Sequence, residues 1–582
     1  MRMTSVNSRQ LTNKRRRVLQ ATITFCLLAL AGPTQVRAAF PRPATSEKGM
    51  VASAHALASE SGVQILKRGG NAIDAAVATA FAISVTLPYS AGIGGGGFLL
   101  LHDGKRGAVR SLDFRERAPL AAHRDMFLDE KGAVRPKAST DGYLSVGVPG
   151  TVAGLYEVHR KYGVLPWPDV VAPAIRLAHD GFRVSELYAK YVEWRKDILL
   201  KHPASAEVFT RKGAPLKKGD LLIQRDLAAT LSRIASNWRD FYEGETATLI
   251  VNDMAKNGGL ITADDLKTYK PTWRKPVCGN YRGHDICSMP PPSSGGVHLV
   301  QMLNMLSHHP LRESGWHSPE SLHLFVESMR IAYADRATHL GDPAFTQVPI
   351  QALTSSAYAK KRFAEIDQNG ARRSTEVLAA PDGDLKRYES PDTSHLTVVD
   401  HEQNVVSLTF TVNYGFGSGV VVPGTGVLLN DEMDDFSVSP GTPNAYGLVG
   451  GEANAVAPAK IPLSSMTPTI VKKNGQFQFA TGSPGGSTII TTVLQVVVHI
   501  IDYDMNAAQA VAAPRFHHQW LPDTVRLEKY GFDPATKKWL SERGHHLEER
   551  DGWGNASVII RRESGVLEGA ADPRGEGSAV GQ

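Results

Sequence analysis

The chain has 582 residues, of which 42% are hydrophobic and 21% charged, so disorder and a fibrous fold are both excluded. Three cysteines are too few for a disulfide-framed scaffold, and no CxxC pair or HExxH segment indicates a metal site, so no metal or organic cofactor is expected. The net charge of +6 does not indicate nucleic-acid binding, because residues 1–38 hold seven of the 64 basic residues and no acidic one, which leaves 57 basic against 58 acidic residues.

The first 38 residues have the pattern of an export signal. A basic cluster, Lys14-Arg15-Arg16-Arg17, precedes an apolar run from Val18 to Ala31, and Val36-Arg37-Ala38 supplies small residues for signal peptidase. The run is short for a membrane span, although a retained anchor is the alternative. We expect removal after residue 38, no stable membrane anchor and, in a Gram-negative source, a periplasmic protein.

Residues 53–87 predict two helices separated at Gly69-Gly70, the second of them buried on most sides. The run Gly92–Gly97 contains GxGxxG, but it follows a helix and leads into a strand, Phe98–Asp103. A dinucleotide-binding turn has the opposite order, with the strand first and the helix second. Close packing of backbone in the core is the better interpretation of these glycines.

Residues from about 150 to 365 are mostly amphipathic helical pattern. Within them, Cys278 and Cys287 lie opposite each other in a hairpin that turns at Arg282-Gly283. An oxidising compartment would allow a disulfide between them, and both the bonded and the free state remain open. Residues 366–392 are turn formers without apolar periodicity, which predicts a mobile linker longer than a compact domain usually contains.

Two β-rich runs follow this linker on either side of His401–Asn404 and predict an antiparallel hairpin. With a three-residue loop, Thr393 lies opposite Thr411, and Asn413 shares the face of Thr411. A slip of one residue in the register would change this arrangement.

Thr393 is a candidate nucleophile because it opens a strand directly after the linker. A cut between Asp392 and Thr393 would give the threonine a free α-amine with a pKa of about 8, which can take the proton from the hydroxyl of the same residue. Taken alone, the position is better explained as a β-branched residue that starts a strand.

The segment Thr393–Asp400 resembles the start of the small subunit of γ-glutamyltranspeptidases, which are N-terminal-nucleophile hydrolases that cleave their own precursor. The resemblance covers nearly the whole mature chain. Its further blocks occur in one order and are Asp113–Pro119, Gly147–Gly154, Tyr333–Arg336, Gly341–Pro343, Asn430–Phe436, Pro462–Pro468 and Gly482–Ser487.

The resemblance implies an α+β fold, the four-layer αββα sandwich. It also implies a large subunit, residues 39–392, and a small subunit, residues 393–582, that remain together as one interleaved heterodimer. Thr393 would be the nucleophile, and Thr411 would hydrogen-bond its hydroxyl. The backbone N–H groups of Gly485 and Gly486 would stabilise the anionic tetrahedral intermediate.

A γ-glutamyl group carries an α-carboxylate and an α-ammonium, and the resemblance assigns residues to each. Arg115, whose planar fork suits a carboxylate, would bind the first with the hydroxyls of Ser464 and Ser465. The ammonium would be bound by Asn413, Glu432 and Asp435, with Glu432 at a position where some family members carry Gln. Tyr446 lies in residues 440–451, which resemble the lid loop of many transpeptidases.

The implied reaction is transfer of the γ-glutamyl group of glutathione or a related compound to water, releasing L-glutamate, or to an amino acid or peptide acceptor. The lid favours glutathione-like substrates. Two alternatives remain open. One is a glutaryl- or cephalosporin-type acylase on the same scaffold, and the other is a non-catalytic periplasmic solute-binding protein.

Overall fold

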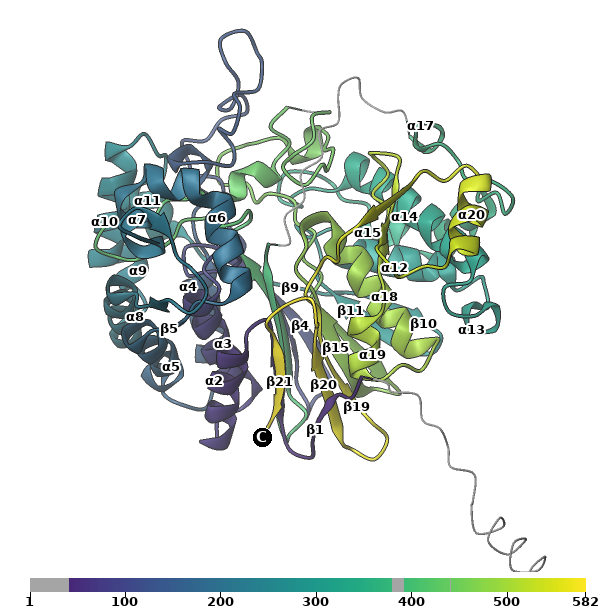
Figure 1. Ribbon diagram of the computed structural model, residues 1–582, viewed down its shortest axis with the longest axis horizontal. Helices are drawn as coiled ribbons and strands as arrows, with labels where there is room; N and C mark the ends of the chain where they lie inside the picture. The colour runs from purple at the N-terminus through teal and green to yellow at the C-terminus, as the bar shows by residue number, and fades with distance from the viewer. Residues whose placement is uncertain (1–40, 379–391, 440) are drawn as a thin grey trace, which may run out of the picture. The chain divides into compact units, whose positions relative to one another are not determined.

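The computed structural model describes residues 41–378, 392–439 and 441–582 (Figure 1). The chain divides into two units, residues 1–41 and 42–582, and the described residues belong almost entirely to the second. The predicted signal peptide and the central part of the predicted linker lie outside the described residues. Within those ranges, a search for a helix with the length and apolarity to cross a bilayer finds none.

Two antiparallel sheets, each seven-stranded in the part of the chain that the structure describes, form the centre of the second unit. In order across the first sheet the strands are β21 (Ser578–Gly581), β2 (Met50–Ser53), β12 (Ser394–Val399), β13 (Val405–Thr411), β3 (Gly96–His102), β4 (Val109–Asp113) and β9 (Thr272–Arg274). Across the second they are β1 (Ala44–Ser46), β20 (Leu567–Ala571), β19 (Ser557–Arg561), β15 (Gln476–Gly482), β14 (Thr469–Lys473), β11 (His284–Ser288) and β10 (Val277–Tyr281). Each of these two sheets therefore contains strands from before and from after residue 392.

Helices cover the outer face of each sheet (Figure 1). On the side of the first sheet lie α2 (Ala56–Lys67), α3 (Ala72–Thr86), α4 (Thr151–Tyr162), α5 (Trp167–Asp180), α6 (Glu186–Lys201), α7 (Pro203–Phe209), α8 (Arg225–Ser236), α9 (Asp240–Glu243), α10 (Glu245–Lys256) and α11 (Ala263–Thr268). On the side of the second lie α12 (Gly295–Leu306), α13 (Leu311–Ser314), α14 (Pro319–His339), α15 (Ile350–Leu353), α16 (Ser356–Ala364), α17 (Ser374–Val377), α18 (Ile489–Ile501), α19 (Ala507–Ala512) and α20 (Pro534–Glu542).

Shorter elements complete the described chain. The small strands are β5 (Phe182–Arg183), β6 (Thr210–Arg211), β7 (Ala214–Pro215), β8 (Leu221–Leu222), β16 (Phe516–His517), β17 (Val525–Glu528) and β18 (Leu547–Arg550). Single 3₁₀ turns are η1 (Tyr143–Ser145), η2 (Glu432–Asp435), η3 (Glu452–Asn454) and η4 (Gly486–Thr488).

The two sheets and the two groups of helices form four layers, and a core of apolar side chains fills each of the three spaces between them. Because side chains alternate along a strand, Leu99 and Leu101 of β3 pack against the helices, whereas Phe98 and Leu100 pack between the sheets. The second sheet repeats the pattern, with Phe479 facing its helices. This arrangement confirms the predicted α+β, four-layer αββα sandwich.

The glycine run Gly92–Gly97 lies in the packed core, as predicted. It contacts Thr411, which lies beside the candidate nucleophile. A Cβ atom on Gly95 would lie 1.9 Å from the carbonyl oxygen of Thr411, and one on Gly94 would lie 2.1 Å from that of Leu428. Only glycine allows the backbone to approach so closely. The predicted helix break is confirmed as well, since α2 ends at Lys67 and the side chain of Asn71 caps α3.

The structure decides the state of the two cysteines and tests the predicted linker. Cys278 and Cys287 are paired across β10 and β11, with Cα atoms 4.2 Å apart, and form a disulfide.

The linker prediction was wrong for its first part. Ser374 begins α17, and its N–H donates to Asp523 Oδ2 at 2.7 Å while its hydroxyl donates to the carbonyl of Trp520 at 2.5 Å. Turn-forming composition did not reveal these contacts with a distant segment.

Candidate active site

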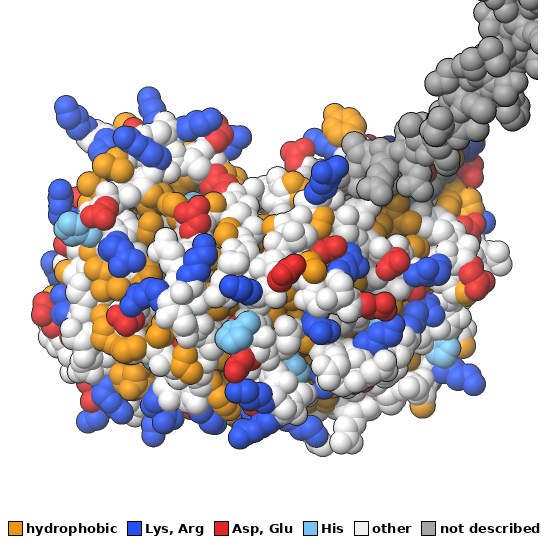
Figure 2. Space-filling model, turned by 90° about the horizontal axis from the view of Figure 1, so that it is seen from below, with side chains coloured by type: hydrophobic (Ala, Val, Ile, Leu, Met, Phe, Trp, Pro, Cys, Tyr) orange, Lys and Arg blue, Asp and Glu red, His pale blue; other side chains and the backbone are white. Residues whose placement is uncertain are grey.

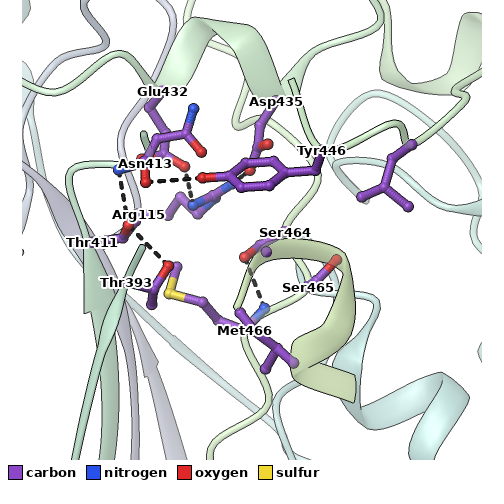
Figure 3. A pocket seen from close by; sticks show the side chains of 13 residues that line it. Arg115, Thr393, Thr411, Asn413, Glu432, Asp435, Tyr446, Ser464, Ser465 and Met466 are labelled. Carbon is purple, nitrogen blue, oxygen red and sulfur yellow. Dashed lines mark hydrogen bonds and ion pairs between the residues drawn. The ribbon is translucent and has the colours of Figure 1, made fainter. Parts of the chain in front are cut away.

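Thr393 lies at the start of β12, beside the end of β13, as the three-residue loop predicts. Ser394 pairs with Phe410, and the hydroxyl oxygens of Thr393 and Thr411 are 3.1 Å apart (Figure 3). The backbone N–H of Asn413 donates to the Thr411 hydroxyl oxygen at 2.8 Å. The Thr411 hydroxyl still has a proton and a second lone pair, so it can donate to the Thr393 hydroxyl or accept from it.

The backbone at the Asp392–Thr393 bond is unusual. Thr393 has φ +95°, a region that a β-branched residue rarely adopts because its Cβ crowds the backbone. The carbonyl oxygen of Asp392 accepts a hydrogen bond from the N–H of Gly485 at 3.2 Å. The peptide bond before the candidate nucleophile is therefore both strained and polarised by a backbone donor.

The side chain of Asp392 is buried, and neither carboxyl oxygen has a hydrogen-bond partner of good geometry among the described residues. Burial raises the pKa of this carboxyl well above its ordinary value, although the charge of Arg195 lowers it in part. Burial therefore favours the neutral form of Asp392 at the candidate cleavage point.

Arg115 sits directly against two predicted site carboxylates. Its guanidinium lies 2.5 Å from Glu432 and 2.5 Å from Asp435, and its side chain is 1% exposed. Burial lowers its pKa, but the two carboxylates more than compensate, so the pKa is raised and the cation is retained. The resemblance assigns Arg115 to the substrate carboxylate, and Glu432 and Asp435 to the substrate ammonium. The structure instead pairs them, because a cation buried to this extent requires counter-charge.

Two further ionisable residues of this cluster were not predicted as site residues. Glu116 is fully buried, and burial raises the pKa of its carboxyl to about 7. Arg336 donates to the Ser465 hydroxyl at 3.3 Å, and burial lowers its pKa to about 10. Each lies inside a sequence block that carries the family resemblance. The resemblance therefore pointed to these segments, but it did not assign either residue to the site.

The candidate lid closes over the opposite side of the site. The Tyr446 hydroxyl donates to the carbonyl oxygen of Asn413 at 2.9 Å (Figure 3). A Cβ atom on Gly486 would lie 2.3 Å from the Tyr446 ring. The hydroxyl oxygen of Ser464 accepts from the N–H of Met466 at 3.1 Å, which fixes the loop of the two serines.

One cavity brings nearly all the predicted residues together (Figure 3). Its lining consists of Arg115, Thr393, Thr411, Asn413, Glu432, Asp435, Tyr446, Leu448, Ser464, Ser465, Met466, Gly486 and Ile489. Gly485 is absent from this lining and acts instead on the Asp392 carbonyl. The apolar liners Leu448, Met466 and Ile489 were missed, because single apolar residues carry no distinguishing pattern. Within the described ranges, no cluster of three or more His, Cys, Asp or Glu residues is arranged to hold a metal ion.

An αββα sandwich with a threonine at the start of a central strand defines the N-terminal-nucleophile hydrolase class. The family model described as gamma-glutamyltranspeptidase matches residues 58–582. The glutathione hydrolase proenzyme of Escherichia coli (strain K12) is 50% identical over 534 residues, which is 91% of each chain. The chain therefore belongs to the γ-glutamyltranspeptidase family.

Solved structures support the same fold. The crystal structure of a cephalosporin acylase from Bacillus halodurans matches with a TM-score of 0.82 and 29% identity, covering 95% of this chain and 99% of that one. The γ-glutamyltranspeptidase of Helicobacter pylori matches with a TM-score of 0.55 and 44% identity, covering 58% of this chain and 95% of that one.

Proposed function

We propose that the chain is a precursor that cuts itself before Thr393 and then acts as a glutathione hydrolase and γ-glutamyltransferase. The observation that carries the proposal is the hydrogen bond from the Gly485 N–H to the Asp392 carbonyl, with the Thr393 hydroxyl beside it. A donor on the carbonyl oxygen and a hydroxyl next to the same peptide bond are the two groups that acyl transfer requires.

In the first reaction, the Thr393 hydroxyl oxygen attacks the carbonyl carbon of Asp392 while Gly485 holds the developing oxyanion. The bond between that carbon and the amide nitrogen of Thr393 breaks, and the nitrogen takes the proton that the hydroxyl has lost. This gives an ester, which water then hydrolyses. The products are the subunits 39–392 and 393–582. The positive φ of Thr393 supports this step, because breaking the bond releases the strain.

In the second reaction, the freed amine of Thr393 takes the proton of its own hydroxyl, which Thr411 orients, and the oxygen attacks the γ-glutamyl amide. Gly485 and Gly486 stabilise the oxyanion, and cysteinylglycine leaves. Water or an amino acid or peptide acceptor then takes the γ-glutamyl group. Water as acceptor gives L-glutamate.

Substrate recognition follows from the charges in the cavity. Arg115, with Ser464 and Ser465, would bind the α-carboxylate, while the α-ammonium would lie against Glu432, Asp435 and Asn413. A zwitterion carries one positive and one negative charge, so the net charge of the cluster does not change when it binds. Its carboxylate would pair with Arg115 and its ammonium with the two acids, in place of the pairs that these side chains make with one another. Tyr446 would close over the bound γ-glutamyl group.

A glutaryl- or cephalosporin-type acylase is the second candidate, and the TM-score of 0.82 to a cephalosporin acylase favours it. A glutaryl group has no α-ammonium. The carboxylates of Glu432, which is buried, and of Asp435, which is partly buried, would then lack a cationic substrate group, so they support the γ-glutamyl substrate instead. A binding protein without catalysis would require an uncut chain.

We also propose a periplasmic location after removal of residues 1–38. The disulfide between Cys278 and Cys287 supports an oxidising compartment, since such bonds are rare in the cytosol. Fractionation of the native host and N-terminal sequencing test this point. A first residue of Ala39 in the periplasmic fraction is expected, and retention of the leader in the membrane fraction would contradict the proposal.

The central experiment measures the intact masses and N-termini of the purified protein. Wild type should give two pieces, one of them beginning at Thr393, while Thr393→Ala remains uncut. Thr268→Ala removes a threonine at the exposed end of α11 and serves as the matched control, which should be cut like wild type. The cut protein is then assayed with glutathione and with a glutaryl amide. A chain that stays uncut on long incubation would refute the mechanism, and a preference for the glutaryl amide would favour the acylase.

A further inference from the structure

A second cavity, of about 290 Å³, lies at the opposite end of the two sheets from Thr393. In the pairing of β13 with β3, Thr411 is opposite Gly96 at one end and Val405 is opposite His102 at the other. Six residues of strand separate these ends, or about 20 Å. The cavity therefore does not belong to the active site.

The turns that join the strands at this end, together with strand residues next to them, form the cavity. Its lining consists of His102, Gly104, Lys105, Arg106, Gly107, Gln403, Gly475, Gln476, Phe477 and Arg561. Both sheets contribute, the first through the turns after β3 and β12 and the second through the turn after β14, the start of β15 and the end of β19. Figure 2 shows the molecule from below, and Lys and Arg side chains are spread widely over that face.

His102 is an unexpected residue for its place in the core. Phe98 and Leu100, which share its side of β3, belong to the apolar layer between the sheets, and His102 continues that row with a polar ring. The residue is 2% exposed, and its Nδ1 has no hydrogen-bond partner among the described residues. A buried polar atom without a partner in a well-packed layer calls for a partner from outside the chain.

Two other side chains of the same cavity have the same property. The Oε1 of Gln403 and the Nε of Arg561 are buried and lack a hydrogen-bond partner within the part of the chain that the structure describes. Gln403 adopts φ +63°, a left-handed conformation that side chains other than glycine rarely take. Three residues that line one cavity therefore each hold a buried polar atom without a partner among the described residues.

The charges around the cavity are not balanced. Lys105 pairs with Glu402 at 3.0 Å, and Arg106 lies 3.9 Å from Asp103. Lys472 donates to the carbonyl of Gly107 at 3.2 Å. Arg561 makes no ion pair with any described residue, so the four cations exceed the two nearby acids.

We propose that this cavity binds a small organic anion, with its carboxylate or phosphate group on Arg561 and on a ring N–H of His102. The backbone and side-chain amides of the turns supply further donors, and the facing rings of His102 and Phe477, 6.3 Å apart, provide a wall for the organic part. The volume is near the lower end of the range for small-molecule sites and exceeds what a bare inorganic ion needs. This inference does not depend on the proposed catalytic function.

The experiment titrates the whole purified protein with citrate, glycerol 3-phosphate and inorganic phosphate by calorimetry, at ionic strength held constant with sodium chloride. Saturable binding of citrate or of glycerol 3-phosphate is expected, and the stronger of the two identifies the carboxylate or the phosphate as the recognised group. Arg561→Gln should weaken that binding at least about tenfold, as expected for loss of a hydrogen bond to a charged group.

The matched control is Arg562→Gln, which makes the same change in charge one residue along the chain. Arg562 pairs with Glu568 at 2.5 Å and does not line the cavity, so its variant should change the affinity less than about twofold, because Glu568 already offsets its charge and salt screens the remainder. Lys105→Gln provides a second test in case Arg561→Gln does not fold. No saturable binding of any probe at about 10 mM, or equal weakening by the two arginine variants, would overturn the proposal.

Discussion

Replacing Thr411 by valine should slow self-cleavage without preventing folding. The change removes the hydroxyl that lies 3.1 Å from the Thr393 hydroxyl oxygen. A hydrogen bond of this kind contributes about 1–2 kcal/mol, which corresponds to cutting about five- to thirtyfold more slowly if the bond acts in the transition state. The change also leaves the N–H of Asn413, now bonded at 2.8 Å, buried without an acceptor, which costs about 1–3 kcal/mol of stability.

The assay follows the loss of full-length chain by intact mass after purification in the cold, with thermal unfolding measured in parallel. Thr411→Ser retains the hydroxyl and should restore most of the rate. Thr409→Val controls for packing, since Thr409 is on the same face of β13 and bonds His395 at 2.8 Å instead of Thr393. A Thr411→Val protein that cuts within about twofold of the wild-type rate would refute the assigned role of Thr411.

Three other variants test the cluster. Arg115→Gln leaves the two carboxylates that face it buried and unpaired, so KM for glutathione should rise at least about a hundredfold and stability should fall by about 3–5 kcal/mol; an unchanged KM would contradict carboxylate binding. Gly486→Ala, at φ +52° with its new Cβ 2.3 Å from Tyr446, should displace the lid and lower kcat/KM for glutathione, and an unaltered value would argue against lid closure. The third test uses uncut Thr393→Ala protein. Because the pKa of Asp392 is raised in the folded state, stability is lost as pH rises above 3.8, so Asp392→Asn should raise Tm near pH 7 and not near pH 3. An equal shift of Tm at both pH values would disprove the buried-acid interpretation.

Local pattern predicts the parts of the fold in which neighbours in sequence are neighbours in space. The hairpin register follows from the three-residue loop, and it places Thr393 beside Thr411 without knowledge of the rest of the chain. The disulfide could not be decided in this way. The hairpin brings Cys278 and Cys287 together, but the redox conditions that join them are not encoded in strand periodicity.

The site required information from distant segments. Arg115 and Glu116 stand in a run of charges that alone suggests a solvated surface, and only the resemblance indicated that Arg115 belongs to the site. Nothing in the local pattern reveals that Glu116 is buried, because its burial arises from backbone packing at Gly96 and Gly147. The paired charges of Arg115, Glu432 and Asp435 depend in the same way on a long-range fold. Ser374 is the opposite case. Its segment has the composition of a turn, but contacts with a distant segment place it in a short helix.

The mixing of strands in the two central sheets has a consequence for the life history of the molecule. A cut before Thr393 leaves two chains that share both central sheets, so neither possesses a complete core, and they can separate only by unfolding. Once unfolded, they would have to find each other by diffusion, without the covalent connection that kept them at high effective concentration. The uncut chain should refold at any dilution, whereas the cut protein should recover poorly when dilute. Such a molecule is assembled once, and its maturation cannot be repeated.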